Sequence, residues 1–211
     1  MIVLINPNST EAMTRAMVET ALKAGVVLEG WTSLDGPAAI QGPDDGAACI
    51  PPLLALVRKA NEAGATAIII GCFDDTGLKE ARDIAACPVI GVGQAAYHMA
   101  ALAGGRFSVV TTLDVSIPIL KGNAHAYGFK AQLARVRASG VPVLDLETDP
   151  DGTADVVIGE INRAVHEDNV KTVVLGCAGM SHIPRYFETR DTVRLVDGVT
   201  SAAQFARLLA T

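Results

Sequence analysis

Ala67-Ile68-Ile69-Ile70-Gly71-Cys72 and Thr172-Val173-Val174-Leu175-Gly176-Cys177 are the two stretches of this sequence that decide its fold. Each is a short apolar run that reaches a glycine and is followed by a cysteine, a pattern typical of a buried parallel strand. The two cysteines stand 105 residues apart in a chain of 211 residues, so each occupies the same place in its half. The pair predicts an α/β protein built from two similar halves.

Further strands and helices alternate around these stretches. The predicted strands cover residues 2–5, 67–70, 89–92, 107–110, 172–175 and 193–196, and weaker strands at 26–31 and 132–136 should each pair beside the first strand of their half. The predicted helices cover residues 9–24, 45–63, 94–103, 154–167 and 201–209. Strand–helix alternation of this kind is typical of parallel sheets covered by helices.

An internal duplication accounts for the repeated offset. When residues 1–105 are laid over residues 106–211, Asn6 falls on Thr111, each at the end of a first strand, and Cys72 falls on Cys177. We therefore expect two Rossmann-like or flavodoxin-like domains with parallel sheets, related by a pseudo-twofold axis, with the active site in the cleft between them. The first domain is predicted to span residues 1–95, completed by 197–211, and the second to span 96–196.

Composition narrows the classes of function. The formal charge of −6 and the scattered 17 Lys and Arg argue against a nucleic-acid partner. The apolar runs are far shorter than the roughly 20 residues of a membrane span, and the chain begins directly with a strand, so we expect a cytoplasmic protein. Four cysteines without a CxxC pattern favour reduced thiols over disulfides or a metal site.

Two thiols at equivalent strand ends suggest proton transfer. Ligands of parallel sheets bind beyond the carboxyl ends of the strands, so Cys72 and Cys177 should lie on two sides of a bound molecule. One group could then remove a proton from a stereocentre while the other returns it to the opposite face. A thiol has a pKa of about 8.5, which we expect to fall further at a helix N-terminus, giving one thiolate and one thiol at rest.

The developing enolate also needs hydrogen-bond donors. Asn8 and Ser9 after the first strand, and Thr111 and Thr112 after its counterpart, are placed to supply them. The plainer interpretation is that Asn8 and Ser9 cap a helix and that the threonines are β-branched strand residues.

Four motifs resemble the hydantoin racemase family, within the wider aspartate, glutamate and hydantoin racemases. They are Ile5-Asn6-Pro7-Asn8-Ser9-Thr10, Cys72-Phe73-Asp74-Asp75-Thr76-Gly77-Leu78, Gly105-Arg106-Phe107-Ser108-Val109-Val110-Thr111-Thr112-Leu113 and Leu175-Gly176-Cys177-Ala178-Gly179-Met180. They occur in the family's order across nearly the whole chain. The resemblance places Cys72 and Cys177 at the family's catalytic positions and implies two α/β domains with a cleft between them.

The same resemblance implies cofactor-free racemisation of a small molecule, a 5-substituted hydantoin or allantoin, often by a homo-oligomer. With it, Phe73, Asp74, Ala178 and Gly179 join the expected substrate-binding residues. Two features depart from the pattern. Many relatives read Cys-Phe-Gly-Asp-Pro-Gly where this chain has Asp74 and Thr76, and an ionised carboxylate at Asp74 would raise the thiol pKa or select a donor on the substrate.

The second departure is His182, five residues after Cys177. Related glutamate racemases have a histidine near this cysteine, so His182 is a candidate substrate-binding residue and keeps an aspartate or glutamate racemase open as the function. The same fold also admits a maleate isomerase or an arylmalonate decarboxylase. A two-lobed binding protein that performs no chemistry is the non-enzymatic interpretation, under which the two thiols are ordinary buried cysteines.

Overall fold

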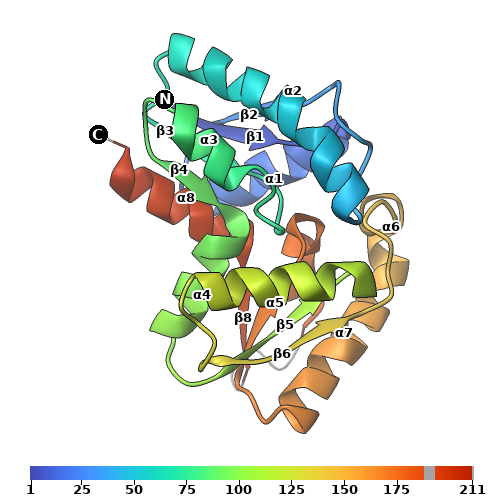
Figure 1. Cartoon of the computed structure of the whole chain (residues 1–211). Coiled ribbons are helices and arrows are strands. Elements are labelled where there is room, and N and C mark those ends of the chain that lie inside the picture. The colour runs from blue at the N-terminus through green and yellow to red at the C-terminus, as the bar shows by residue number, and fades with distance from the viewer. Residues whose placement is uncertain (188–192, 211) are drawn as a thin grey trace.

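The computed structural model describes residues 1–187 and 193–210, and it places two four-stranded parallel sheets one above the other (Figure 1). The first sheet contains β1 (Ile2–Asn6), β2 (Glu29–Thr32), β3 (Ala67–Ile70) and β4 (Val89–Gly91) in the order β2-β1-β3-β4. The second contains β5 (Phe107–Thr111), β6 (Leu133–Ala138), β7 (Thr172–Leu175) and β8 (Arg194–Asp197) in the order β6-β5-β7-β8. The predicted α/β class and the two similar halves are confirmed.

The strand register repeats between the halves. Ile2 pairs with Ala67 across β1 and β3, and Phe107 pairs with Thr172 across β5 and β7, so the offset of 105 residues holds pair by pair. At the last strand the offset grows by one residue, because Ile68 pairs with Val89 whereas Val173 pairs with Leu195. The two weaker strands also lie where predicted, β2 beside β1 and β6 beside β5.

Helices cover both faces of each sheet. The first half carries α1 (Glu11–Lys23), α2 (Pro43–Glu62) and α3 (Leu78–Ile84), and the second carries α5 (Ile117–Ala126), α6 (Asp145–Thr148) and α7 (Pro150–Glu167), with 3₁₀ segments η1 (Asp114–Ser116) and η2 (Ala178–Arg185). The pattern did not predict α3, α5, α6 or the 3₁₀ segments, and it started α7 too late. Asp149 caps α7 by accepting the Gly152 N–H at 3.0 Å, and Pro150 opens the helix.

Two helices join the halves. The helix α4 (Val92–Leu102) follows β4 but packs against β7, β8 and α5, whereas α8 (Gly198–Leu209) follows β8 and packs against β3, β4 and α1. They also pack against each other, and one apolar core containing Tyr97, Phe107, Val174 and Ala202 runs through both halves. The boundaries proposed at residues 95 and 197 stay a prediction. No helix in the described ranges is long and apolar enough to cross a membrane.

Candidate active site

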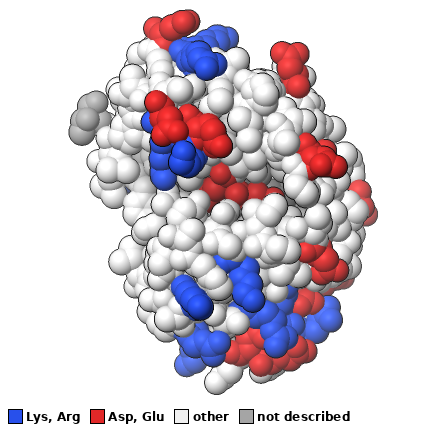
Figure 2. Space-filling model, in the orientation of Figure 1, with Lys and Arg blue, Asp and Glu red and all other residues white. Residues whose placement is uncertain are grey.

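The carboxyl ends of β1, β3, β5 and β7 meet at a cavity between the two halves, with about 570 Å³ of empty space including the part open to solvent. Figure 2 shows the hollow between the halves, with acidic side chains at its base. The cavity has eighteen lining residues: Asn8, Met13, Ala16, Met17, Ile40, Gly71, Cys72, Phe73, Asp74, Thr111, Thr112, Ser116, Val143, Glu147, Gly176, Cys177, Ala178 and Gly179. It therefore contains both cysteines and most of the side chains that the sequence nominated.

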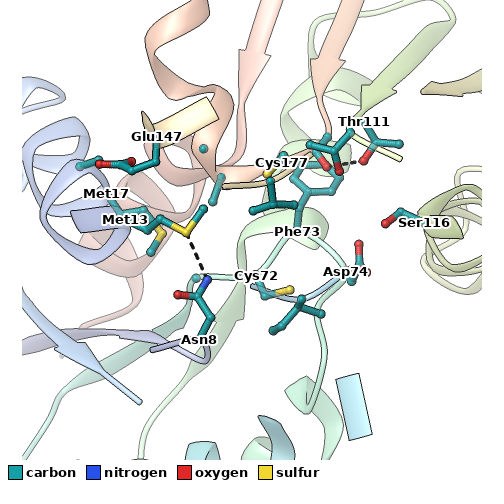
Figure 3. Close-up of a pocket in the computed structure, with 18 residues that line it drawn as sticks. Asn8, Met13, Met17, Cys72, Phe73, Asp74, Thr111, Ser116, Glu147 and Cys177 are labelled. Atoms are coloured by element: carbon teal, nitrogen blue, oxygen red, sulfur yellow. Dashed lines mark hydrogen bonds between the residues drawn. The ribbon is translucent and has the colours of Figure 1, made fainter. Parts of the chain in front are cut away.

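The two thiols enter the cavity from different halves (Figure 3). Both cysteines are partly buried and free. Each follows a glycine that allows close packing at the strand end: a Cβ on Gly71 would lie 2.9 Å from Met17 Sδ, and one on Gly176 would lie 2.9 Å from the Val110 carbonyl oxygen. The glycine of each Gly-Cys pair thus lets the chain pass close to a neighbouring element, and the thiol lies beyond the end of the strand.

The electrostatics of the thiols correct one expectation. Burial and the neighbouring Asp74 carboxylate raise the pKa of Cys72 well above its ordinary value, and burial raises the pKa of Cys177 to about 12. The expected fall of the thiol pKa is wrong, because desolvation outweighs the local N–H groups and Cys72 lies several residues before the start of α3. At neutral pH both groups are therefore mostly thiols, and the expected resting pair of one thiolate and one thiol is disfavoured.

At each thiol, a backbone N–H in the same position of the loop partly offsets the rise in pKa. The N–H of Asp74 lowers the pKa of Cys72, and the N–H of Gly179 lowers the pKa of Cys177. Each donor lies two residues after its cysteine, so the duplicated loops supply the same group to both sides. An anion formed at either sulfur meets a fixed N–H dipole.

Asp74 is the acidic group that the two thiols share. Its carboxyl lines the cavity, and burial raises its pKa to about 6, so it is mostly ionised at neutral pH. Its charge raises the pKa of Cys72, of Cys177 and of the buried Cys49. The effect of the Asp74 carboxylate on the first thiol was expected from the sequence, whereas its effects on Cys177 and Cys49 appear only in the fold.

The polar residues after the first strands are held by local hydrogen bonds. Asn8 Oδ1 accepts the Asn6 amide at 2.9 Å and the Thr10 N–H at 3.0 Å, which leaves its amide nitrogen on the cavity side, 3.4 Å from Met13 Sδ. Thr111 donates its hydroxyl to the Gly176 carbonyl at 2.9 Å. Thr111 therefore ties the second thiol strand to β5.

Two of the predicted substrate-binding residues do not line the thiol cavity. Ser9 does not line the cavity, and its N–H donates to the Pro37 carbonyl at 2.9 Å. His182 lies on η2 and lines an adjoining hollow, which shares Ala178 and Gly179 with the thiol cavity. Burial lowers the pKa of His182, and its Nε2 is buried without a hydrogen-bond partner in the described part of the chain.

Sequence reasoning missed the side chains that cover the cavity from elsewhere in the fold: Met13, Ala16, Met17, Ile40, Ser116, Val143 and Glu147. Ser116 offered a usable signal, because it stands a few residues beyond β5, at the same sheet edge as Thr111. The others come from helix faces and long connections that the tertiary fold brings over the cavity. One hydrogen bond fixes part of that cover: the Val143 N–H donates to Gln41 Oε1 at 2.9 Å, across the two halves.

Known proteins are similar to this chain in sequence and in fold. Residues 2–206 match the model of the family described as Asp/Glu/Hydantoin racemase. A hydantoin racemase of Rhizobium meliloti is 42% identical over 98% of this chain and 87% of its own length. Another, from a Pseudomonas strain, is 33% identical over 98% of this chain and 84% of its own length.

Among solved structures, an allantoin racemase from Klebsiella pneumoniae superposes with a TM-score of 0.94 and 34% identity, covering 99% of this chain and 86% of the other. A glutamate racemase from Campylobacter jejuni superposes with a TM-score of 0.67 at 17% identity, covering 99% of this chain and 85% of the other, which shows a common fold. A family match across nearly the whole chain, together with relatives above 30% identity, establishes the assignment. The chain belongs to the Asp/Glu/hydantoin racemase family.

Proposed function

We propose that this racemase inverts the stereocentre of a 5-substituted hydantoin or of allantoin, with Cys72 and Cys177 as the two acid–base groups. The observation that carries the proposal is the pair of thiols entering one cavity from equivalent strand ends of the two halves. The names of the similar proteins, hydantoin racemase and allantoin racemase, support this substrate class.

In the proposed reaction, one cysteine sulfur, as thiolate, takes the hydrogen from the stereocentre beside the ring carbonyl. The electron pair left on that carbon delocalises onto the carbonyl oxygen as an enolate. The opposite thiol then delivers its proton to the other face, and the electron pair returns to form the new C–H bond. The second sulfur leaves as thiolate, so the two cysteines have exchanged roles and the net charge of the site is unchanged.

Hydrogen-bond donors around the cavity suit a neutral ring with carbonyl groups. The Asn8 amide and the hydroxyls of Thr112 and Ser116 line it, and none of these three side chains donates to a backbone carbonyl among the described residues. Hydrogen-bond donors beside the developing negative charge stabilise an enolate. We assign them to the carbonyl oxygens of the substrate.

Charge separates this proposal from racemisation of a free amino acid. The described residues that line the cavity include the carboxylates Asp74 and Glu147 and no Lys or Arg. A free aspartate or glutamate carries two carboxylates, whose like charge these groups would repel. A hydantoin ring offers N–H donors instead, which carboxylates accept.

The decisive test uses optically pure hydantoins and allantoin in D₂O. The wild-type enzyme should racemise its substrate and exchange the hydrogen at the stereocentre for deuterium. Cys72→Ser and Cys177→Ser should each abolish inversion, while exchange of one enantiomer survives at the remaining thiol. Cys87→Ser, a change at a free cysteine outside the cavity, is the matched control. Full racemisation by either active-site variant contradicts the two-thiol mechanism.

A cytoplasmic location, where thiols stay reduced, and assembly as a homo-oligomer complete the proposal. The four free cysteines agree with a reducing compartment. Size-exclusion chromatography with light scattering would measure the number of copies.

A further inference from the structure

The loops that carry the two thiols are built alike. The Asp75 N–H donates to the Cys72 carbonyl at 3.0 Å, and the Met180 N–H donates to the Cys177 carbonyl at 3.0 Å. Each loop then approaches the N-terminus of the helix that follows the last strand of its half, α4 in the first half and α8 in the second. The contact between loop and helix therefore helps to set the place of each thiol.

In the first half the contact is the Asp75 carboxylate. Oδ1 accepts the Gly93 N–H at 3.0 Å, and Oδ2 accepts the Gln94 N–H at 2.7 Å. Oδ2 also accepts the hydroxyl of Tyr127, at the end of α5, at 2.9 Å. Asp75 is buried and has a φ of 52°, a left-handed conformation uncommon for a residue with a side chain. The thiol loop itself thus supplies the cap of α4.

In the second half the carboxylate comes from the strand. Asp197, the last residue of β8, accepts the Thr200 N–H at 2.8 Å and the Val199 N–H at 3.4 Å at the start of α8. The thiol loop reaches this carboxylate through Ser181, whose hydroxyl donates to Asp197 Oδ1 at 2.9 Å. The same three parts meet in both halves: a thiol loop, a carboxylate and a helix N-terminus.

Gly91 accounts for the difference between the two halves in where the capping carboxylate comes from. Gly91 is the residue before α4, as Asp197 is the residue before α8. A Cβ on Gly91 would lie 2.1 Å from Asp75 Oδ1, so the Asp75 carboxylate fills the space that a side chain at position 91 would need. The halves therefore keep the carboxylate and differ in which residue delivers it.

We propose that Asp75 and Asp197 are matched positioning residues: Asp75 holds the Cys72 loop and Asp197 holds the Cys177 loop, each against a helix N-terminus. The inference rests on the proposed two-thiol racemisation. Neither aspartate lines the thiol cavity, so each acts through the loop it anchors. Each therefore governs proton transfer on one face of the substrate.

The test compares Asp75→Asn with Asp197→Asn, using each pure enantiomer in D₂O at a pH of about 8.5, above the pKa of about 7 to which burial raises Asp75. Exchange at the stereocentre is followed by NMR and inversion by chiral chromatography. Both variants should slow inversion. Asp75→Asn should slow exchange of the enantiomer served by Cys72 by about 10²-fold, the usual cost of a group displaced by about 1 Å, and spare the other enantiomer. Asp197→Asn should do the reverse.

Cys72→Ser and Cys177→Ser assign each enantiomer to its thiol, and Asp155→Asn, at an exposed position on α7, is the control for removal of a carboxylate. Equal slowing of both enantiomers in each variant, or no change in either, overturns the inference. If Asp75→Asn fails to fold by circular dichroism, Tyr127→Phe removes one donor to Asp75 and should slow exchange on the Cys72 face alone. Tyr97→Phe, whose hydroxyl donates to the Leu120 carbonyl, is its control.

A second readout needs no substrate and separates this inference from the proposed function. The rate of iodoacetamide modification of each cysteine, measured by peptide mass spectrometry, should change at Cys72 alone in Asp75→Asn and at Cys177 alone in Asp197→Asn. A wild-type enzyme that leaves every hydantoin unchanged would refute the proposed function. Modification rates that change at both cysteines in either variant, or at neither, would refute the positioning roles.

Discussion

The charge of Asp74 gives the most direct check on the electrostatics of the site. Asp74→Asn keeps the shape of the side chain and removes the carboxylate that raises the pKa of both thiols. Asp74 lines the same cavity as both thiols, so its charge acts on them over a distance on the order of 10 Å. At an effective dielectric constant of about 20, a unit charge 10 Å away destabilises a thiolate by about 1.7 kcal/mol.

That free energy corresponds to a factor of about 18 in the thiolate population at a given pH. A thiolate of lower pKa is also a weaker nucleophile, with a Brønsted coefficient of about 0.45, so the net gain in alkylation rate is about fivefold. The gain should be larger at Cys72, because Cys72 and Asp74 lie two residues apart in one loop whereas Cys177 belongs to the other half. We therefore expect iodoacetamide to modify both cysteines faster in the variant at pH 7.5.

The assay is peptide mass spectrometry of the modified cysteines over time, at pH values from 5 to 9. Because burial raises the pKa of Asp74 to about 6, the wild-type carboxyl becomes neutral as the pH falls below this value, and the two proteins should then react alike. Glu147→Gln removes a carboxylate that lines the same cavity but does not contribute to the thiol pKa values. Equal rates for Asp74→Asn and wild type at pH 7.5 would refute this account of the thiol environment.

Three further predictions follow from the described contacts. The racemisation rate at low substrate concentration should rise between pH 7 and 9 by up to about tenfold per pH unit. Both thiols have raised pKa values, so the fraction present as reactive thiolate increases with pH over this range. A flat pH profile between these values would contradict the prediction. Gly176→Ala should lower both the stability and the activity of the enzyme, since its Cβ would lie 2.9 Å from the Val110 carbonyl oxygen. Gly159→Ala, on α7 with open space around it, should instead raise the free energy of unfolding in urea by about 0.5–1 kcal/mol. Arg137→Met should destabilise by about 1.5–3 kcal/mol, because Asp168 and Glu160 lose their shared guanidinium while Asp168 keeps Arg135 and Glu160 keeps Arg163. A loss below about 1 kcal/mol in the same assay would show that the network relaxes.

The repeated stretches predicted most of the scaffold correctly. All eight strands lie at or within a few residues of their expected places, because short β-branched runs bounded by glycine carry a strong local signal. The offset of 105 residues also located both thiols at equivalent strand ends. The sequence pattern did not predict the helices α3 and α5. The helix α3 (Leu78–Ile84) is only seven residues long, and α5 (Ile117–Ala126) contains Pro118 and Gly122, which have low helix propensity.

The candidate site was predicted in part. Asn8, Phe73, Thr111 and Thr112 line the cavity because they lie at or just beyond the carboxyl ends of β1, β3 and β5, a position that local sequence reveals. Glu147 and Val143 lie in a long connection between β6 and α7, which carries no periodicity that would place it over the cavity. Ser9 shows the limit of the positional argument, because it follows the same strand as Asn8 and yet faces Pro37.

The sequence by itself therefore determined the duplication, the place of the weaker strand beside the first strand of each half and the pairing of Cys72 with Cys177, because these depend on local periodicity and on spacing along the chain. Only the tertiary structure decided the chemistry of the thiols. Desolvation and the charge of Asp74 depend on which segments cover the cavity, so the thiol pKa values rise although the expected helix N-terminus suggested a fall. The same holds for Asp75 and Asp197, whose matched contacts arise only when two loops and two helices pack together.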